Sequence, residues 1–310
     1  MPEPRLVFTG NVIVDLVMTI TELPEPGGDT IASSSAMTAG GGYNTMVAAA
    51  RDGLEVVFAG QYGTGPFASI VRDALTAGGF GVVQPGLDDI DSGFCVALVD
   101  ASTERTFVTS VGAEGHLGRA DLDRLHVRSA DLVYVSGYSL AHPVNAEALP
   151  GWLADLPPRV RVITDPSPLV GELPTAALGA VLARTDVLSL NRREALIMTD
   201  AADIAVAAGH LLRRLDRRGA AVVLRDGDAG CWIADDTGPP RHIDGFPVQA
   251  VDTNGAGDAH GGVLAAGLAR GDDLATAARR ANAAAAIAVT RVGPATAPTG
   301  EEITRLLYGN

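Results

Sequence analysis

The sequence predicts an α/β protein: a doubly wound, mostly parallel sheet with helices on both faces and a small antiparallel β lid. Short apolar segments of strand length alternate with segments of helix length along most of the chain, a pattern typical of parallel sheets covered on both faces. Two segments rich in Thr, Ser and Val break this alternation, at about 16–38 and 92–110. With 310 residues, 47% of them hydrophobic, the chain can bury one large core, so we treat 1–310 as a single domain.

The elements of the core follow from apolar runs taken in chain order. Residues 5–15 predict one buried strand, interrupted at Gly10 and Asn11. Small residues at 43–52 predict a helix, 55–60 the next strand and 66–77 another helix; further strands are expected at 130–136, 160–165, 186–190 and 220–224, with helix-length segments between them.

The segment 92–110 predicts a β-hairpin. Alternating patterns at 94–99 and 105–108 flank a turn at 100–103, and no helix lies between them. Together with 16–38, this hairpin predicts a small sheet that projects from the core and closes over a ligand as a lid. The alternative is an ordinary edge extension of the main sheet, and the pattern alone leaves both open.

The charge and the choice of basic residues exclude several classes of function. The formal net charge is −14, which disfavours binding to bulk nucleic acid. All 23 basic residues are arginine, and without lysine there is no Walker A loop, no protein-kinase strand lysine and no Schiff-base lysine. A polyanionic ligand must therefore bring cations, and a nucleotide with Mg2+ fits that requirement.

The chain shows no run of about 18 apolar residues and no signal-peptide pattern. We therefore expect a cytoplasmic protein that does not act at a membrane. Cys95 and Cys231 both lie in apolar, strand-like stretches, which favours buried thiols over a disulfide or a metal pair.

The most informative motif is AVDTNGAGD at 250–258, directly before a small-residue helix at 259–270. A glycine-rich turn that opens a helix points several backbone N–H groups at one spot, and the helix dipole adds positive charge, so the turn suits a phosphate. Asp258 would repel a phosphate, but it makes sense as the group that takes a proton from an attacking hydroxyl. The motif predicts phosphoryl transfer to an alcohol; the plainer alternative is a loop with an N-cap aspartate.

Two further clusters have the residue types of a ligand site. Gly40, Gly41 and Asn44 open the helix at 43–52, where glycines permit close approach of a ligand and Asn44 offers a donor and an acceptor. Asp15 ends the first predicted strand, where open α/β sheets bind ligands. Its carboxylate can accept two hydrogen bonds from a vicinal diol, although a turn-capping role is the alternative.

Asn191 and Glu194 follow directly on the predicted strand at 186–190. Three residues apart at a helix start, they share one face and could hold Mg2+ through water, but a capping box has similar spacing. Gly227 and Gly230 flank a later turn that either accepts a nucleotide or is a plain turn.

Together, in this order, these motifs resemble the ribokinase-like (PfkB) family of carbohydrate and nucleoside kinases. The resemblance spans nearly the whole chain, from 10–15 to 291–293. It rests on two signatures, the helix opening at 40–51 and the specific DTNGAGD sequence at 252–258. It implies a ribokinase-like fold, with ATP and Mg2+ as cofactors and K+ as a further candidate.

The resemblance also implies roles for single residues. Asp258 would be the base that activates the acceptor hydroxyl, and the amides of Gly255, Ala256 and Gly257 would form an anion hole for charge developing on the γ-phosphate. The other implied contacts are Asn191 and Glu194 with Mg-ATP, Gly227, Gly230 and Asn282 with the nucleotide, Asp15, Gly40, Gly41 and Asn44 with sugar hydroxyls, and Asp252 with a potassium-type cation.

Several positions depart from the family pattern. Gly41 stands in place of a ribokinase lysine and Tyr138 in place of a sugar-contacting glutamate, which puts ribose in doubt as the substrate. His260 replaces an aromatic residue; it either reports on the substrate or packs on a helix face, the commoner case. Arg105, in the predicted hairpin, either points inward to substrate oxygens or outward as a solvated edge charge.

We therefore expect ATP-dependent phosphorylation of a hydroxyl, a primary one being favoured, of a small sugar. Between positions 15 and 110 the arginines are Arg51, Arg72 and Arg105, too few near the lid to favour a phosphorylated acceptor. A nucleoside kinase on the same fold stays open, although the lid offers only Phe94 and Phe107 for a base. A non-catalytic sugar or nucleotide sensor is the other alternative. The resemblance further implies a homodimer formed through the lid.

Overall fold

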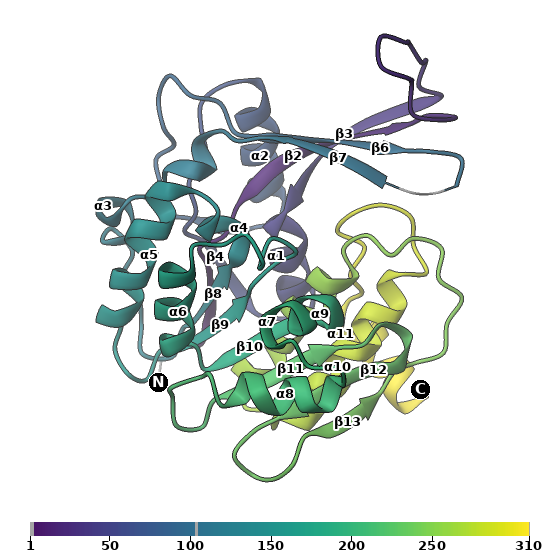
Figure 1. Cartoon of the computed structure of the whole chain (residues 1–310). Helices are drawn as coiled ribbons and strands as arrows, with labels where there is room; N and C mark the ends of the chain where they lie inside the picture. Colours follow the sequence, from purple (N-terminus) through teal and green to yellow (C-terminus); the bar gives the residue numbers. More distant parts are fainter. Residues whose placement is uncertain (1–2, 103–104, 310) are drawn as a thin grey trace.

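The computed structural model describes residues 3–102 and 105–309, with a large sheet in the core and a smaller one projecting from it (Figure 1). Within these residues the large sheet has nine strands in the order β13-β12-β11-β10-β9-β8-β1-β4-β5. Pairs from β5 to β11 are parallel, whereas β12 and β13 are antiparallel, so the predicted mostly parallel sheet is confirmed. Its strands are β1 Arg5–Phe8, β4 Glu55–Phe58, β5 Gly81–Val82, β8 Leu132–Ser136, β9 Arg161–Asp165, β10 Val187–Asn191, β11 Ala221–Arg225, β12 Gly230–Ala234 and β13 Arg241–Asp244.

Helices cover both faces of this sheet. On one face α1, α2, α9, α10 and α11 share a buried cluster with β1 and β4. On the other face α3 to α8 pack in two clusters against strands β8 to β11. The helices are α1 Gly42–Arg51, α2 Pro66–Ala77, α3 Arg119–Leu122, α4 Gly137–Leu140, α5 Pro143–Asp155, α6 Thr175–Arg184, α7 Arg192–Thr199, α8 Ile204–Leu212, α9 Ala256–Arg270, α10 Leu274–Ala288 and α11 Gly300–Tyr308, with short 3-10 turns at Ala113–His116 and Gly227–Ala229.

The first predicted strand, 5–15, is in fact two strands in different sheets. β1 ends at Phe8 in the large sheet, and β2 (Val12–Thr19) belongs to the small one. The chain crosses between the sheets at Gly10, where an added Cβ would lie 2.6 Å from the Phe8 ring. The prediction that Asp15 ends a core strand is therefore wrong, because Asp15 lies within β2 of the small sheet.

The small sheet is a separate layer, not an edge extension of the large one. Its order is β3-β2-β6-β7, with β3 at Ser34–Gly41, β6 at Phe94–Val99 and β7 at Arg105–Ser110. β2 and β3 are antiparallel, as are β6 and β7, and parallel pairing of β2 with β6 joins the two halves. The predicted turn at 100–103 lies partly outside the described residues. β3 continues directly into α1 at Gly42.

Helices α1 and α9 approach each other closely through small residues. An added Cβ on Gly262 would lie 2.3 Å from the carbonyl oxygen of Thr45 and 2.7 Å from the Cβ of Ala48. No side chain larger than hydrogen fits there unless one of the helices shifts. Because both helices begin at the carboxyl edge of the sheet, this contact fixes the relative position of their first turns.

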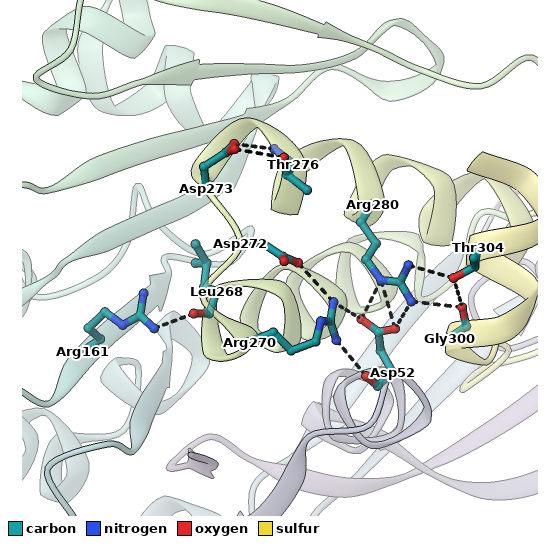
Figure 2. Close-up of polar contacts among 10 residues, drawn as sticks. All are labelled: Asp52, Arg161, Leu268, Arg270, Asp272, Asp273, Thr276, Arg280, Gly300 and Thr304. Atoms are coloured by element: carbon teal, nitrogen blue, oxygen red, sulfur yellow. Dashed lines mark hydrogen bonds and ion pairs between the residues drawn. The ribbon is translucent and has the colours of Figure 1, made fainter. Parts of the chain in front are cut away.

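The far ends of the same helices are joined through Asp52, which caps α1 and has a fully buried side chain (Figure 2). Arg270, at the end of α9, donates to its carbonyl oxygen at 2.9 Å and to its carboxylate at 3.0 Å. Arg280 of α10 forms a bidentate pair with the same carboxylate and donates to the carbonyl of Gly300 in α11. One carboxylate thus connects four helices, beside a cavity of about 700 Å³ that is lined by residues of these helices.

The cysteines and the apolar helices bear on two predictions made from composition. In the described part of the chain both cysteines are buried and unpaired, as predicted. Across residues 3–102 and 105–309 no single helix has the length and apolar character to cross a membrane; only the bent pair α7–α8 meets those criteria jointly.

We expect Asp52→Ala to lower the free energy of unfolding by about 3 kcal/mol, because it leaves Arg280 buried without its counter-ion. The measurement is urea unfolding followed by circular dichroism. Asp155→Ala is the matched control, since the Asp155–Arg119 pair is exposed and should contribute less than about 1 kcal/mol. Equal losses in the two variants would contradict the assigned role of Asp52.

Candidate active site

The candidate site lies at the carboxyl ends of the parallel strands, under the small sheet. Tyr138 follows β8, Asp165 ends β9, Asn191 ends β10 and Arg225 ends β11. The first turns of α1 and α9 face the same edge, and their side chains meet there. This is the region of an open α/β sheet in which ligands usually bind.

Asp258, in the first turn of α9, is held at this edge by two side chains of α1. Thr45 Oγ1 donates to its Oδ1 at 2.8 Å, and Asn44 Nδ2 lies 3.4 Å from its Oδ2. Burial raises the pKa of Asp258 to about 6, and the negative charge of Asp165 adds to this, against the lowering effect of the Thr45 hydrogen bond. A carboxylate with a pKa near 6 is ionised at neutral pH and basic enough to accept a proton.

The turn before Asp258 presents free backbone donors. Gly255 caps α9 with φ 74°, in the left-handed region that favours glycine. Ala256 N donates to Thr253 O at 3.3 Å. Among residues 3–102 and 105–309, the amides of Gly255 and Gly257 have no acceptor. Free N–H groups at the start of a 15-residue helix suit an anion, as the motif predicts.

Arg225 and Asp165 are site residues that the sequence analysis missed. Arg225 donates to Asp165 Oδ2 at 3.1 and 3.2 Å and to Ser189 Oγ at 2.8 Å. An added Cβ on Gly257 would lie 3.7 Å from its guanidinium, so Arg225 sits beside the free amides. The available signal was that Asp165 ends one predicted strand and Arg225 follows another, but nothing in the sequence pairs residues 60 positions apart.

Asn191 and Glu194 form the capping box that was the alternative interpretation of their spacing. Glu194 accepts from the backbone N of Asn191 at 2.8 Å and from its side chain at 2.7 Å, and Asn191 Oδ1 accepts from Glu194 N at 2.9 Å. Burial and the charge of Asp165 raise the pKa of Glu194, while Arg225, 3.8 Å away, opposes this. The capping role does not remove the carboxylate from the site.

Asp15 and Gly40 face the site from the small sheet. An added Cβ on Gly40 would lie 1.9 Å from Asp15 Oδ2, so a side chain at this position would displace the carboxylate from where it lies. Burial, followed by the charge of Asp258, raises the pKa of Asp15 to about 6. Gly41 caps α1 with φ 61°, and the buried Oδ1 of Asn44 has no hydrogen-bond partner in the described chain. An unsatisfied buried acceptor beside two carboxylates suits a hydroxyl-bearing ligand.

Tyr138 and Arg105 border the site from opposite sides. The side chain of Tyr138 is 44% exposed; burial of its hydroxyl and the charges of Asp258, Asp165 and Glu194 raise the pKa of Tyr138 to about 12. Arg105 points inward, so the solvated edge position is not what the structure shows. It pairs with Asp252 at 2.5 Å rather than standing free for a ligand.

Two predicted residues lie behind the site surface. His260 is buried and packs within α9, as the commoner alternative predicted; burial lowers the pKa of His260 to about 3, so it is neutral. Asn282 Oδ1 contacts His260 Nε2 at 3.2 Å, and its Nδ2 donates to the carbonyls of Ile243 and Asp244. Its amide is thus committed to protein contacts.

Gly227 and Gly230, with φ 62° and 105°, form the turn between β11 and β12.

The site offers carboxylate oxygens as potential ligands for Mg2+. Within the described residues no group of three or more His, Cys, Asp or Glu side chains could hold a metal ion. The carboxylates of Glu194 and Asp165, which both neighbour Arg225, are hard oxygen donors of the kind that Mg2+ takes together with water and phosphate oxygens. The site therefore fits a magnesium ion that arrives with a nucleotide.

Comparison with known proteins gives consistent matches over the whole chain. The model of the pfkB family carbohydrate kinases matches residues 3–300. The chain is 35% identical over 311 residues to an uncharacterised sugar kinase, YegV, of Escherichia coli, covering 96% of this chain and 92% of that one. It is 30% identical over 310 residues to an ATP-dependent ribose-1-phosphate kinase of Halopiger xanaduensis, covering 98% of both. A putative ribokinase II of E. coli solved with ATP and Mg2+ shares the fold, with TM-score 0.79, 21% identity and 99% coverage of each chain.

The raised pKa of Asp258 predicts a pH-dependent stability. Because folding raises its pKa from 3.8 to about 6, wild type loses stability as the pH rises through 6, whereas Asp258→Asn cannot ionise. We expect the variant to gain about 2–3 kcal/mol relative to wild type between about pH 4 and pH 8. Urea unfolding of both proteins at the two pH values measures this, and a difference that does not change with pH contradicts it.

Proposed function

The chain belongs to the pfkB family of carbohydrate kinases, and on that premise we propose that it transfers the γ-phosphoryl group of Mg-ATP to a hydroxyl of a small, unphosphorylated sugar. A primary hydroxyl is favoured. The observation that carries the proposal is the carboxylate of Asp258, held by Thr45 and Asn44 beside the free amides that open α9. Base and anion site are adjacent, as an in-line transfer to an alcohol requires.

In this proposal Asp258 accepts the proton of the attacking hydroxyl. Its pKa of about 6 keeps it ionised at neutral pH and provides proton affinity. The free N–H groups of Gly255 and Gly257 stabilise the charge that develops on the transferring phosphoryl group, and that of Ala256 would join them only by giving up its hydrogen bond to Thr253 O. Mg2+, bound with the nucleotide near Glu194 and Asn191, would neutralise phosphate charge.

Sugar recognition is assigned to residues of the small sheet and of the core. Asp15, ionised above about pH 6, accepts hydrogen bonds from sugar hydroxyls, and the free Oδ1 of Asn44 accepts another. Gly40 leaves the Asp15 carboxylate its place, because a side chain at position 40 would overlap it, and Gly41 provides the left-handed turn that opens α1. Tyr138, protonated at neutral pH, contributes a hydroxyl donor from the core side.

The arginines support a free sugar over a phosphorylated one. The relative from H. xanaduensis is named for ribose 1-phosphate, and such an acceptor needs free positive charge near the lid. Arg105 is paired with Asp252, and Arg51 donates to the carbonyls of Ala295 and Ala297. Arg225 is neutralised by Asp165 at the anion side of the site, so it would meet the ATP phosphates rather than the acceptor.

The nucleoside alternative depends on the two lid phenylalanines. Phe94 packs on Phe67, with ring centroids 4.7 Å apart. Phe107 remains 59% exposed on the lid. Because one exposed ring is a poor slot for a base, the sugar is preferred. A sensor without catalysis has no need of a positioned base such as Asp258.

The proposal is tested by ADP release from Mg-ATP with a panel of pentoses, hexoses, ketoses, polyols, sugar phosphates and nucleosides. We expect release with free sugars, and a loss of about 1,000-fold in kcat for Asp258→Asn, because the base is removed. Binding of ATP to that variant should be unchanged.

Asp15→Asn is the matched control for this test. It removes a carboxylate from the sugar side and should raise KM more than it lowers kcat. Near-wild-type turnover by Asp258→Asn excludes the mechanism, and release only with nucleosides or sugar phosphates replaces the free sugar by that acceptor. The absence of ADP release with every compound favours the non-catalytic sugar or nucleotide sensor.

We also propose a homodimer formed through the lid. Cross-strand pairing places Met37, Leu16, Val96 and Val108 in one row across all four strands. Asp15 and Cys95 alternate with this row and face the core, so the row faces outward. Met37 and Val108 are 54% and 62% exposed. An apolar row of this kind on a solvent-facing sheet fits a second copy of the same sheet.

We expect Val108→Glu to shift the protein from dimer to monomer in size-exclusion chromatography with light scattering, because a charge is buried in the proposed interface. Val206→Glu is the control, since Val206 is similarly exposed, at 48%, but lies on α8 of the core. A wild-type protein that is monomeric at all concentrations overturns this proposal.

A further inference from the structure

An ion pair connects the start of β7 in the lid to the loop that precedes the anion site. Arg105, the first residue of β7, contacts Asp252 Oδ1 through Nη2 at 2.5 Å across 147 residues of sequence. The two side chains are 26% and 11% exposed. Arg105 shares a lid face with Asp15, because Arg105 pairs with Val99, Val99 with Thr19, and Thr19 lies four residues along the strand from Asp15.

Asp252 itself is the meeting point of three segments. Its Oδ1 also accepts from Asn254 N at 2.8 Å, and its Oδ2 accepts from Gly293 N at 3.0 Å. Its own backbone N donates to Val289 O, at the end of α10. The carboxylate thus holds the lid, the turn that leads into Gly255, and the loop after α10 in one place.

The carboxylate of Asp252 also needs a positive partner. Burial disfavours its charge, and the hydrogen bonds from Asn254, Gly293 and Arg105 together with the charge of Arg105 more than offset this, so the pKa of Asp252 lies below its ordinary value. In the described chain, Arg105 is the only cationic side chain that pairs with it. Two neutral N–H groups alone would leave a largely buried negative charge without a counter-ion.

We propose that Arg105 is a positioning residue of the kinase that supplies the counter-charge at Asp252 in place of a monovalent cation, and by the same contact closes the lid onto the anion loop. This inference rests on the proposed function. The resemblance assigned Asp252 to a potassium-type cation; here the guanidinium occupies that carboxylate instead.

The position of the pair explains how it would act on the reaction. Asp252 holds the N–H of Asn254, and Gly255 follows directly as the cap of α9. A shift of Asp252 would therefore move the amides that face the phosphoryl group, and small misplacements are costly in such sites. Since Arg105 belongs to the lid, this positioning would be complete only when the lid is closed over the sugar.

The first test measures the dependence of turnover on the monovalent cation. For wild type we expect kcat in K+, Na+ and tetramethylammonium salts to agree within about twofold. For Arg105→Gln we expect a loss of about tenfold or more in tetramethylammonium, with partial recovery in K+ or in millimolar guanidinium. A merely structural role for Arg105 would not be rescued by a small cation.

Arg72→Gln is the matched control, because Arg72 is exposed on α2, away from the lid tip. It should behave as wild type in all salts. The proposal is overturned if wild type requires K+ for turnover, or if Arg105→Gln keeps wild-type kcat without any added cation.

The second test needs no substrate and separates this inference from the proposed function. Amide hydrogen exchange of the unliganded protein should be faster at 105–110 and at 253–257 in both Arg105→Gln and Asp252→Asn, and unchanged in Arg72→Gln. Unaltered exchange at both segments overturns the proposal, whatever the panel of sugars shows. Faster exchange in a protein that phosphorylates nothing supports the ion pair and refutes the kinase.

Discussion

The close approach of α1 and α9 is the constraint on which the site depends. Gly262 lies against the carbonyl of Thr45 with no room for a side chain, so the first turns of both helices keep a fixed register and the Thr45 hydroxyl reaches Asp258. At the opposite ends Asp52 joins the same helices through Arg270, and it holds α10 through Arg280. The two helices are therefore held at both ends, and the position of Asp258 depends on contacts at the far ends of these helices as well as on its own neighbours.

The surroundings of each carboxylate decide its protonation. Asp15 and Asp258 are buried near each other, Asp258 also lies near Asp165, and the pKa of each of the first two rises to about 6. Asp252, only six residues before Asp258, has three N–H donors, and its pKa falls. Chemically identical groups are thus divided between proton acceptors and permanent anions. Arg225 partly balances the negative charges of Asp165 and Glu194. The Mg2+ that arrives with a nucleotide would supply further positive charge.

Much of the fold follows from the sequence, because apolar runs separated by helix-length segments leave few other arrangements. The division of 5–15 between two sheets does not, since residues 12–14 are as apolar as 6–8 and only tertiary packing decides which sheet they join. The glycine turn and Asp258 could be placed because neighbours in sequence build that part of the site. Arg225 with Asp165, and Arg105 with Asp252, could not, because each pair joins distant segments. Asn191 and Glu194 show a third limit: a capping box and a metal-facing pair have the same spacing.

The direct junction of β3 with α1 has a mechanical consequence. β3 ends at Gly41, and α1 begins at the next residue, so no slack loop absorbs a rotation of the small sheet. A rotation of that sheet about Gly41 would therefore also move the first turn of α1, which carries Asn44 and Thr45. Tilting the small sheet away from the core would then stretch the hydrogen bond from Thr45 to Asp258. In the proposed kinase, this coupling would align Asp258 only while a sugar holds the small sheet against the core, so that water would not replace the sugar as phosphoryl acceptor.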